Sequence, residues 1–432
     1  MHEEGLVEMA AADDTVGIDM SLTRRSALLG GSAAGAALLS SAANAGVAPG
    51  LIKRYALPRK LSNVDHAVVY RRDDEMVGWP HVMGFWNMGD GEILQQVTSI
   101  TTRYGNADDI SHDNLGREGL GSRSVALRSK DYGRTWEAPV FNMMANADKS
   151  QAKVKTIGDL QPIDFLDKNI LIANNGTAFG DPKGKSVVRV SKDRGRSWGP
   201  SIPVPMDGLN SLHGMNSVLI RPDGTAMIWL MEVDKQGWSR HPCVFAVNPG
   251  GTDFHFMTFI TKKEDPKGEA DGDWQSTFRF GGHRWFYPRG YMLPNGRMLC
   301  VMRSQRDPRG VMWTEVYYSD DGGRTWDFLS RVNDFGSPGS LVRLPDGRLV
   351  MVYGYRLAPS GIRATVSEDE GKSWGPELII RDDGGSWDLG YPNAWVTDDG
   401  KIGVLYYFNS KDDRIQANGG VRHIARSIFS ID

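Results

Sequence analysis

Polar side chains flank proline at several points along this chain, each directly before an apolar stretch. Proline fixes the backbone and has no N–H to donate, so it suits the first residues of a strand. A strand that enters a core is expected to begin with apolar residues, yet imidazole, amide and guanidinium groups stand here. Clustered polar and titratable groups of this kind indicate a functional site, with a solvated rim as the simpler alternative. The motifs are Trp79-Pro80-His81, Gln161-Pro162, Tyr287-Pro288-Arg289, Ser337-Pro338-Gly339 and Tyr391-Pro392-Asn393, with His213-Gly214-Met215-Asn216 before a sixth strand.

Three arginines add a preference for negatively charged ligands. Arg289 belongs to one of these motifs, and Arg303 and Arg356 each follow an apolar run, at equivalent ends of a second strand. A guanidinium group binds a carboxylate through two parallel hydrogen bonds. The set therefore predicts an acidic oligo- or polysaccharide as the substrate. We expect further substrate contacts from Trp79, Gln161, His213, Asn216 and Asn393.

This combination suits the removal of a proton next to a carboxylate. The intermediate of such a reaction places a second negative charge on the carboxylate, so the enzyme must neutralise it. His81 and His112 would serve as acid and base and Tyr391 would assist, while Arg289 and Arg303 bind the carboxylate. The scheme requires no metal and no other cofactor. His112 lies in a glycine-containing segment that we expect to form a loop over the site, although a plain surface loop fits this composition equally well.

An eight-residue pattern, S-x-D-x-G-x-[ST]-W, appears four times and identifies the elements that hold these residues. Aspartate at the start of a turn accepts hydrogen bonds from backbone N–H groups a few residues on, and glycine supplies the positive φ that closes the turn. The tryptophan packs into the layer beneath. Each copy follows a β-branched or aromatic stretch, so we interpret it as the turn of a β-hairpin. The copies are Ser129–Trp136, Ser191–Trp198, Ser319–Trp326 and Ser367–Trp374.

These turns resemble the Asp-box, or BNR, repeat of the sialidase superfamily. The resemblance implies a β-propeller in which the boxes stabilise turns away from the reaction centre. In sialidases three arginines hold the carboxylate of sialic acid, a tyrosine paired with a glutamate is the nucleophile, and an aspartate is the acid/base. The matching residues would be Tyr391 as nucleophile, Glu232 as its partner, Asp108 or Asp113 as the acid, and Arg303 and Arg356 as carboxylate ligands.

The first proline motif departs from the sialidase pattern. Where sialidases have Arg-Ile-Pro at the start of the first blade, this chain has Gly78-Trp79-Pro80-His81. That segment, with Gly84-Phe85-Trp86 and Glu92-Ile93-Leu94 after it, is similar to sialidase-like propeller polysaccharide lyases that act beside uronic acids. The resemblance implies β-elimination, in which Arg, His or Gln neutralises the uronate and His or Tyr moves the proton. The absence of tyrosine between Tyr132 and Tyr287 argues against the ulvan-lyase type.

The repeats predict an all-β, six-bladed propeller of the sialidase type with four-stranded antiparallel blades, and seven blades are the alternative. Consecutive boxes are 62, 128 and 48 residues apart (191 − 129, 319 − 191, 367 − 319), so the long gap spans about two modules, with Asn248–Thr252 as the remnant of a lost box. Residues 66–72 would pair with a final strand at 421–429 to close the ring. Tight Asp-Gly and Asn-Gly turns recur at 89–91, 222–224, 294–296, 345–347 and 398–400, and Asp167-Lys168-Asn169 fills the missing place, after a strand at 161–166.

The N-terminal residues match an export signal. Ser21–Leu29 contains the twin arginines Arg24 and Arg25, an Ala/Gly/Leu run follows, and Ala43-Asn44-Ala45 supplies a cleavage site. We expect residues 1–45 to be a removed signal region, 46–62 an N-terminal arm and 63–432 a single catalytic propeller. The twin-arginine export machinery would deliver the protein, as a monomer, to the periplasm or outside the cell.

Charge and cysteine content exclude several other classes. The net charge of −3 gives no field that would attract nucleic acid. Cys243 and Cys300 are too few for a disulfide framework or a cysteine-rich metal site, and two buried thiols are the expected state. Three functions fit the sequence: uronate β-elimination, which we favour, hydrolysis by the sialidase-type set, and glycan binding without catalysis. His81 and His112 favour an enzyme, because a binding protein needs no pair of imidazoles at one mouth.

Overall fold

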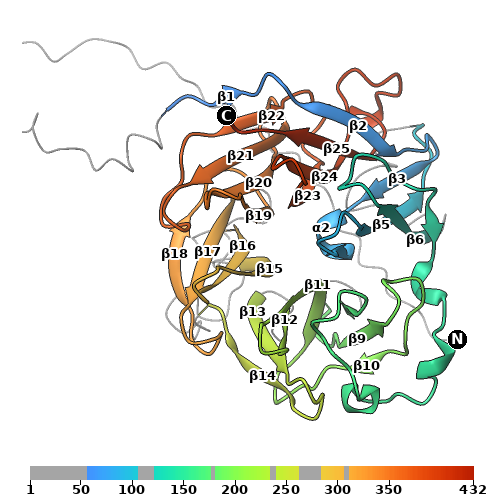
Figure 1. Cartoon of the computed structure of the whole chain (residues 1–432). Coiled ribbons are helices and arrows are strands. Elements are labelled where there is room, and N and C mark those ends of the chain that lie inside the picture. Colours follow the sequence, from blue (N-terminus) through green and yellow to red (C-terminus); the bar gives the residue numbers. More distant parts are fainter. Residues whose placement is uncertain (1–55, 106–120, 177–180, 234–239, 262–283, 306–310) are drawn as a thin grey trace, which may run out of the picture. The chain divides into compact units, whose positions relative to one another are not determined.

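Six sheets lie around a common centre in the computed structural model (Figure 1). The structure describes residues 56–105, 121–176, 181–233, 240–261, 284–305 and 311–432. Each sheet is one blade, so the prediction of an all-β, six-bladed propeller is confirmed. Within these ranges no helix is long and apolar enough to cross a membrane.

The blades follow the order of the chain, and the strand nearest the centre comes first (Figure 1). Blade 1 contains β3 (Glu75–Gly78), α2 (Pro80–Met83), β4 (Phe85–Asn87), β5 (Ile93–Thr101), β6 (Ser122–Ser129) and β7 (Val140–Phe141). Blade 2 contains β8 (Leu171–Gly176), β9 (Ser186–Ser191) and β10 (Ile202–Pro203), preceded by 3₁₀ turns at Met143–Ala145, Lys149–Gln151 and Ile157–Leu160. Blade 3 contains β11 (Leu212–Ile220), β12 (Ala226–Val233), β13 (Arg240–Val247) and β14 (Phe254–Phe259). Blade 4 contains β15 (Arg284–Met292), β16 (Met298–Gln305), β17 (Met312–Ser319) and β18 (Asp327–Arg331). Blade 5 contains β19 (Gly339–Arg343), β20 (Leu349–Tyr355), β21 (Gly361–Ser367) and β22 (Leu378–Arg381). Blade 6 contains β23 (Gly390–Val396), β24 (Ile402–Phe408), a 3₁₀ turn at Ala417–Gly419, β25 (His423–Phe429) and β2 (Asp65–Tyr70).

The two ends of the propeller meet in blade 6. Strand β2 runs antiparallel to β25, with Asp65 opposite Ile428, so the predicted closure of the ring is confirmed. Just before it, β1 (Arg59–Lys60) pairs in parallel with β22 and adds a fifth strand to blade 5. Residues near both ends of the propeller are therefore held by neighbouring strands.

The four Asp-boxes form the turns between β6 and β7, β9 and β10, β17 and β18, and β21 and β22. In the second copy, Asp193 Oδ1 accepts hydrogen bonds from the N–H of Arg196 at 2.9 Å and of Ser197 at 2.8 Å, and Oδ2 accepts one from Ser197 Oγ at 2.6 Å. The predicted remnant in blade 3 behaves alike, because Asn248 Oδ1 accepts a bond from Thr252 N at 3.0 Å between β13 and β14. Antiparallel strands alternate in direction, so the boxes lie at one end of the blades and the starts of the inner strands at the other.

Blade 2 lacks the inner strand that residues 161–166 were expected to form. Asp159 Oδ2 accepts hydrogen bonds from the N–H of Lys155 and Thr156, which starts a 3₁₀ turn over Ile157–Leu160 instead. Side chains from the neighbouring blades form hydrogen bonds to backbone groups along the edge of β8 where the inner strand is missing. Trp86 Nε1 donates to Ile172 O at 3.0 Å, and Asn216 Oδ1 accepts from Asn174 N at 3.0 Å. Blade 2 is thus a three-stranded sheet tied directly to blades 1 and 3.

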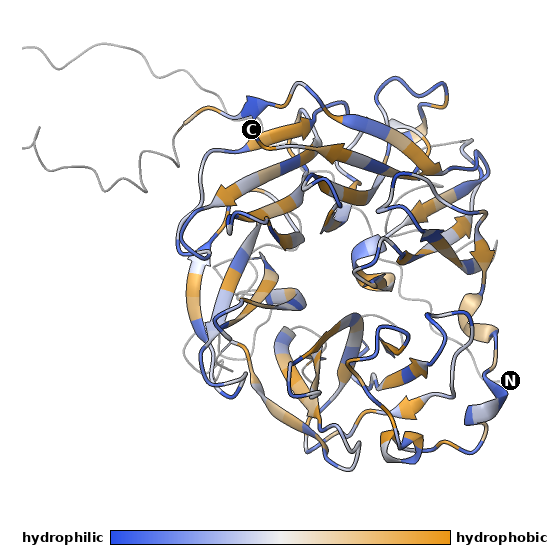
Figure 2. Cartoon of the chain, in the orientation of Figure 1, coloured by the Kyte–Doolittle hydropathy of each residue, from blue (hydrophilic) through white to orange (hydrophobic). Residues whose placement is uncertain are grey.

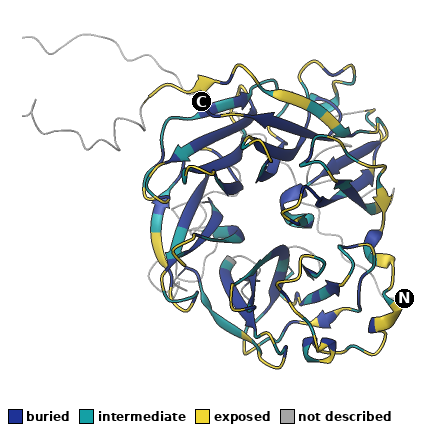
Figure 3. Cartoon of the chain, viewed as in Figure 1, coloured by how far each residue is buried: buried dark blue, intermediate teal, exposed yellow. Residues whose placement is uncertain are grey.

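The hydrophobic core lies between adjacent blades. Figure 2 shows hydrophobic residues concentrated along the strands, and Figure 3 shows that the inner strands are largely buried while loops and outer strands are exposed. Val350 of blade 5 and Tyr406 of blade 6, for example, belong to one buried cluster. Burying an aliphatic side chain such as that of Val350 contributes about 1.5–3 kcal/mol to the free energy of unfolding. Cys243 and Cys300 are both buried and form no disulfide bond with each other, as predicted.

Candidate active site

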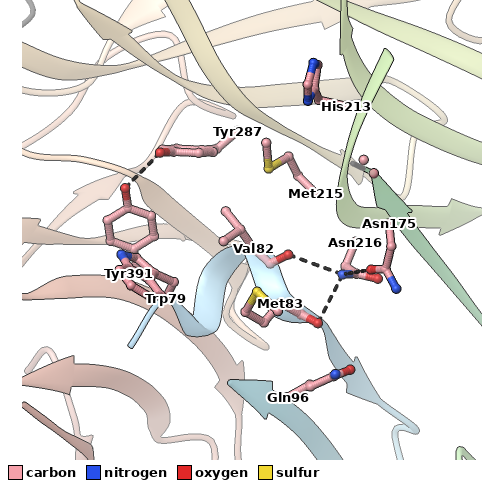
Figure 4. Close-up of a pocket in the computed structure, with 12 residues that line it drawn as sticks. Trp79, Val82, Met83, Gln96, Asn175, His213, Met215, Asn216, Tyr287 and Tyr391 are labelled. Atoms are coloured by element: carbon pink, nitrogen blue, oxygen red, sulfur yellow. Dashed lines mark hydrogen bonds between the residues drawn. The ribbon is translucent and has the colours of Figure 1, made fainter. Parts of the chain in front are cut away.

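A cavity of about 480 Å³ lies where the inner strands of the blades begin (Figure 4). Ligand pockets in proteins commonly have this size and combine apolar walls with a few polar groups. The described residues in its wall include no Asp, Glu, Lys or Arg side chain. The wall is formed by Trp79, Val82, Met83, Gln96, Asn175, Gly176, His213, Gly214, Met215, Asn216, Tyr287 and Tyr391.

Four of the wall residues have a left-handed backbone. The φ angles are 59° at Trp79, 50° at Asn216, 60° at Tyr287 and 52° at Tyr391. The last three sit where the pairing of an inner strand with its neighbour shifts register, and Trp79 precedes the helical turn α2. A bulge redirects a side chain away from the regular alternation of a strand. Positive φ is unfavourable for residues other than glycine and concentrates at functional sites, so its repetition around one cavity supports a site here.

Two tyrosine hydroxyls meet inside the cavity. The hydroxyl oxygens of Tyr287 and Tyr391 are 2.8 Å apart, and both side chains are buried (Figure 4). Burial raises the pKa of Tyr287 well above its ordinary value, and the neighbouring Tyr391 raises it further, while Arg303 opposes the shift. Tyr287 therefore stays protonated and can act as a proton donor.

Arg303 and Arg356 stand behind this pair. The guanidinium carbon of Arg303 is 5.6 Å from the ring centre of Tyr287, and that of Arg356 is 5.4 Å from the ring centres of both Tyr391 and Trp387. Their side chains donate to neutral oxygens, of Gln305 and of Leu389 respectively, and the Nε atoms of both are buried without a hydrogen-bond partner. In the part of the chain that the structure describes, neither arginine forms an ion pair. Two positive charges thus lie beside the tyrosines without a direct carboxylate contact among the described residues, and the charge of Asp388 acts on Arg356 from a distance.

Three residues that follow proline come together at the helical turn α2, which contains the first of them. They are His81, Arg289 and Asn393. Arg289 donates to Asn393 Oδ1 and to the carbonyl oxygen of His81. Asn393 Nδ2 donates to Pro80 O at 2.9 Å, and His81 Nδ1 donates to Pro392 O at 2.9 Å. Burial, followed by the charge of Arg289, holds the pKa of His81 well below its ordinary value, and burial lowers the pKa of Arg289 to about 10. None of the three side chains lies in the cavity wall, so the network supports α2 from below.

The remaining predicted residues are dispersed. His213 and Asn216 line the wall, with His213 Nε2 bonded to Asp181 O at 3.0 Å. Glu232 is buried outside the wall and accepts a bond from Asn210 N at 3.0 Å. Gln161 is exposed and donates to Pro249 O at 3.0 Å, in the turn between β13 and β14, because its inner strand does not form. Asp108, His112 and Asp113 lie outside the described residues.

The sequence motifs did not predict a functional role for Gln96, Asn175, Met215 or the hydroxyl of Tyr287. A signal existed for Tyr287, because it occupies the same Tyr-Pro dipeptide as Tyr391. Gln96 and Asn175 had none, since each is one of two consecutive identical residues within an ordinary strand sequence. Across the described ranges, no group of three or more His, Cys, Asp and Glu side chains could hold a metal ion.

Six blades, Asp-box turns and a cavity at the start of the inner strands define a propeller of the sialidase superfamily. The chain belongs to the BNR repeat-like domain family, which matches residues 167–404, more than half of its length.

Individual relatives agree with this assignment. A sialidase of Micromonospora viridifaciens is 26% identical over 285 residues, a match that covers 59% of this chain and 42% of that protein, so the chain aligns with less than half of its relative. Among solved structures, a protein of unknown function from Dyadobacter fermentans has a TM-score of 0.60 at 21% identity, covering 85% of this chain and 99% of that one. Trypanosoma rangeli sialidase has a TM-score of 0.53 at 14% identity (85% and 60% covered), and an α-L-arabinanase from Penicillium chrysogenum has 0.51 at 12% (86% and 99%). At these identities the structures share the fold alone.

Proposed function

We propose that this protein cleaves an acidic polysaccharide by β-elimination next to a uronate. One observation carries the proposal: the hydroxyl pair of Tyr287 and Tyr391 adjoins two arginines that form no ion pair with any described residue. Elimination requires a group that takes a proton, a group that gives one, and positive charge for the uronate. The described residues supply all three without a carboxylate in the cavity wall.

In this reaction the side-chain oxygen of Tyr391 removes the proton from C5 of the uronate. The electron pair of the C5–H bond forms the C4=C5 double bond, and the bond from C4 to the glycosidic oxygen breaks. Tyr287, which its raised pKa keeps protonated, donates its proton to the leaving oxygen. The Tyr391 hydroxyl then returns a proton to Tyr287 across their 2.8 Å hydrogen bond, which restores the starting state. Arg303 and Arg356 neutralise the uronate carboxylate throughout.

Hydrolysis of an acidic sugar is the second candidate, and the relationship to a sialidase favours it. Glycoside hydrolysis of the sialidase type needs a carboxylate beside the nucleophilic tyrosine and a second one as acid. Glu232 would be the first, but its carboxylate is bonded to the backbone of Asn210 and the Tyr391 hydroxyl is bonded to Tyr287. Asp108 and Asp113 remain the candidates for the second.

Product analysis separates the two reactions. The protein is incubated with polysaccharides that contain glucuronate, galacturonate or iduronate, and both ultraviolet absorbance and product mass are followed. Elimination yields a new end with a C4=C5 double bond, which absorbs and is lighter by one water than the hydrolysis product. New reducing ends without that absorbance would establish hydrolysis and overturn the proposal. Binding without any cleavage of these polymers would instead identify a glycan-binding propeller.

We further propose that the substrate is met outside the cytoplasm, because residues 21–45 match a twin-arginine signal. Fusion of residues 1–45 to a reporter that is active only after export tests this directly. Replacement of Arg24 and Arg25 by lysine should abolish export, whereas unchanged export of that variant would overturn the assignment.

A further inference from the structure

Gln95 and Gln96 are consecutive residues of β5 with opposite surroundings. Gln95 Nε2 donates to the carbonyl oxygens of Pro80, Gly84 and Gln96 at 2.7–2.8 Å, and its Oε1 accepts from Asn393 Nδ2 at 2.7 Å. Gln96, which faces the other side of the strand, lines the cavity (Figure 4). Its Oε1 is buried and has no hydrogen-bond partner. One glutamine thus anchors α2, and the other presents an unsatisfied acceptor to the cavity.

The side chain of Asn216, also in the cavity wall, forms its hydrogen bonds with groups other than Gln96. Asn216 Nδ2 donates to Val82 O at 3.2 Å, Met83 O at 3.0 Å and Asn175 Oδ1 at 2.8 Å, and Asn216 Oδ1 accepts from Asn174 N. These amides are therefore occupied in tying blades 2 and 3 to α2. A buried acceptor without a donor costs free energy, and one that faces a cavity can receive the donor from a ligand that enters it.

We propose that Gln96 accepts a hydrogen bond from a hydroxyl group of a neutral sugar unit adjacent to the uronate. This inference rests on the proposed function for the position of the uronate at Tyr287 and Tyr391. Gln96 comes from blade 1, whereas Arg303 and Arg356 stack on the tyrosines from blades 4 and 5. No cationic side chain lies in the described wall that could balance the carboxylate of a second uronate. Trp79 and Met83 add apolar surface in the same wall, suited to the C–H face of a sugar ring.

The substrate is accordingly a polysaccharide in which uronate and neutral sugar units alternate, rather than a pure polyuronate. A cavity of about 480 Å³ has room for more than one sugar ring. The fit requires no change of the chain, because the Gln96 side chain gives up no hydrogen bond to receive the sugar.

Binding and turnover test the two proposals separately. Oligosaccharides of four units are prepared from paired polymers: hyaluronan against cellouronate for glucuronate, and rhamnogalacturonan I against polygalacturonate for galacturonate. Titration calorimetry with Tyr391→Phe, which slows cleavage, should give at least tenfold tighter binding of the alternating member of one pair. Gln96→Met in the same background should reduce this preference about tenfold, to near equality. Equal binding of both members, or a preference that Gln96→Met leaves intact, would overturn the subsite.

A matched control is Gln151→Met. Gln151 is also a buried glutamine whose Oε1 lacks a partner, but it lies in a 3₁₀ turn before blade 2, outside the cavity wall. It should leave the preference unchanged. Gln96→Asn, which keeps a shorter amide, serves if Gln96→Met does not fold, and it too should weaken binding of the alternating oligosaccharide. A binding preference for the alternating oligosaccharide without any unsaturated product would support the Gln96 subsite and refute elimination. Unsaturated product without that binding preference would support elimination and refute the subsite.

Discussion

The hydroxyl oxygens of Tyr287 and Tyr391 lie 2.8 Å apart, although the residues are 104 positions apart in the chain and belong to blades 4 and 6. Both residues precede proline, have a left-handed backbone and occupy the bulge of an inner strand. The bulge turns each side chain out of the regular alternation of its strand. The same local geometry in two blades therefore brings together two groups that the sequence keeps far apart.

Removing either hydroxyl should abolish most of the activity. Tyr391→Phe and Tyr287→Phe are each expected to lower kcat at least about 100-fold, the usual contribution of one acid or base. Because the two groups share a proton, the double variant should be little worse than either single one. Rates of formation of unsaturated product measure all three. Tyr318→Phe is the control, since Tyr318 packs against Arg297 at the far end of blade 4. Additive losses in the double variant would show that the tyrosines act independently.

The two arginines should determine affinity for the acidic substrate. Arg303→Met and Arg356→Met each remove a positive charge that is in no ion pair with a described residue, so KM for an acidic polymer is expected to rise about tenfold or more. For the same reason, the KM of the unmodified protein should increase with salt concentration. Initial rates at several salt concentrations measure both effects. Arg324→Met, at an exposed arginine of the third box, should change neither. A KM independent of both arginines would exclude an acidic group at this position.

The sequence predicted the fold well because its signals are local. An Asp-box closes its turn with hydrogen bonds between residues at most four positions apart, so four copies indicate four hairpins wherever they occur. The missing inner strand of blade 2 had a local cause as well, namely the bonds of Asp159 to Lys155 and Thr156. These hydrogen bonds favour a 3₁₀ turn over a strand. The turn prevails here because side chains of the neighbouring blades form the hydrogen bonds to β8 that an inner strand would otherwise form.

The site was predicted only in part, for a different reason. In three motifs polarity drew attention to the residue after proline, and those three residues form the network at α2. The residue before proline faces the cavity instead. Which neighbour faces inward depends on the register shift at each bulge, and the pairing partner that creates the shift is distant in sequence. The residues that face the cavity are Trp79, Tyr287 and Tyr391, and those beneath are His81, Arg289 and Asn393.

The Asp-boxes should matter for stability and not for activity. Asp193→Ala removes the acceptor of four hydrogen bonds in the second box and leaves the N–H groups of Arg196 and Ser197 without it. The free energy of unfolding is expected to fall by about 1–3 kcal/mol. Urea denaturation measures this, and kcat at low temperature should be unchanged because the box lies at the end of the blade opposite the cavity. A large loss of activity in folded protein would contradict that separation.

Stability should decline in mild acid because of buried histidines. The pKa of His423 is lowered from its ordinary 6.5 to about 4, chiefly by burial and also by the charges of Arg71 and Arg381, while Val421 O and Asp413 oppose the shift. Above pH 6.5 the imidazole is neutral in both states and its contribution is fully present. As the pH falls toward 4 the unfolded chain binds a proton that the folded chain excludes, so roughly 3 kcal/mol is lost.

His423→Gln should therefore flatten the dependence of unfolding free energy on pH between about 6.5 and 4. His81, whose pKa burial also lowers, adds a loss in the same direction that remains in this variant. The Asp carboxylates with lowered pKa, such as Asp90 at about 2, add a loss that begins as the pH approaches their ordinary value of 3.8 and that is the same in both proteins. Denaturation midpoints across the pH range provide the measurement, with the exposed His255→Gln as control. Parallel curves for His423→Gln and the unmodified protein would refute the assignment.

Asn216 should matter in two ways: its own backbone is left-handed, and its side-chain amide holds α2 in position. Its amide bonds link blade 3 to Val82 O, Met83 O and Asn175 Oδ1, and its φ is 50°. Asn216→Gly loses the amide but tolerates this φ, whereas Asn216→Ala loses the amide and adds strain on the order of 1 kcal/mol. Both variants should raise KM, because α2 is released from the cavity wall, and the glycine variant should unfold at higher urea concentration than the alanine variant. Equal stabilities would show that the backbone at Asn216 is not held in the left-handed region, and an unchanged KM in both would show that α2 keeps its place without the amide.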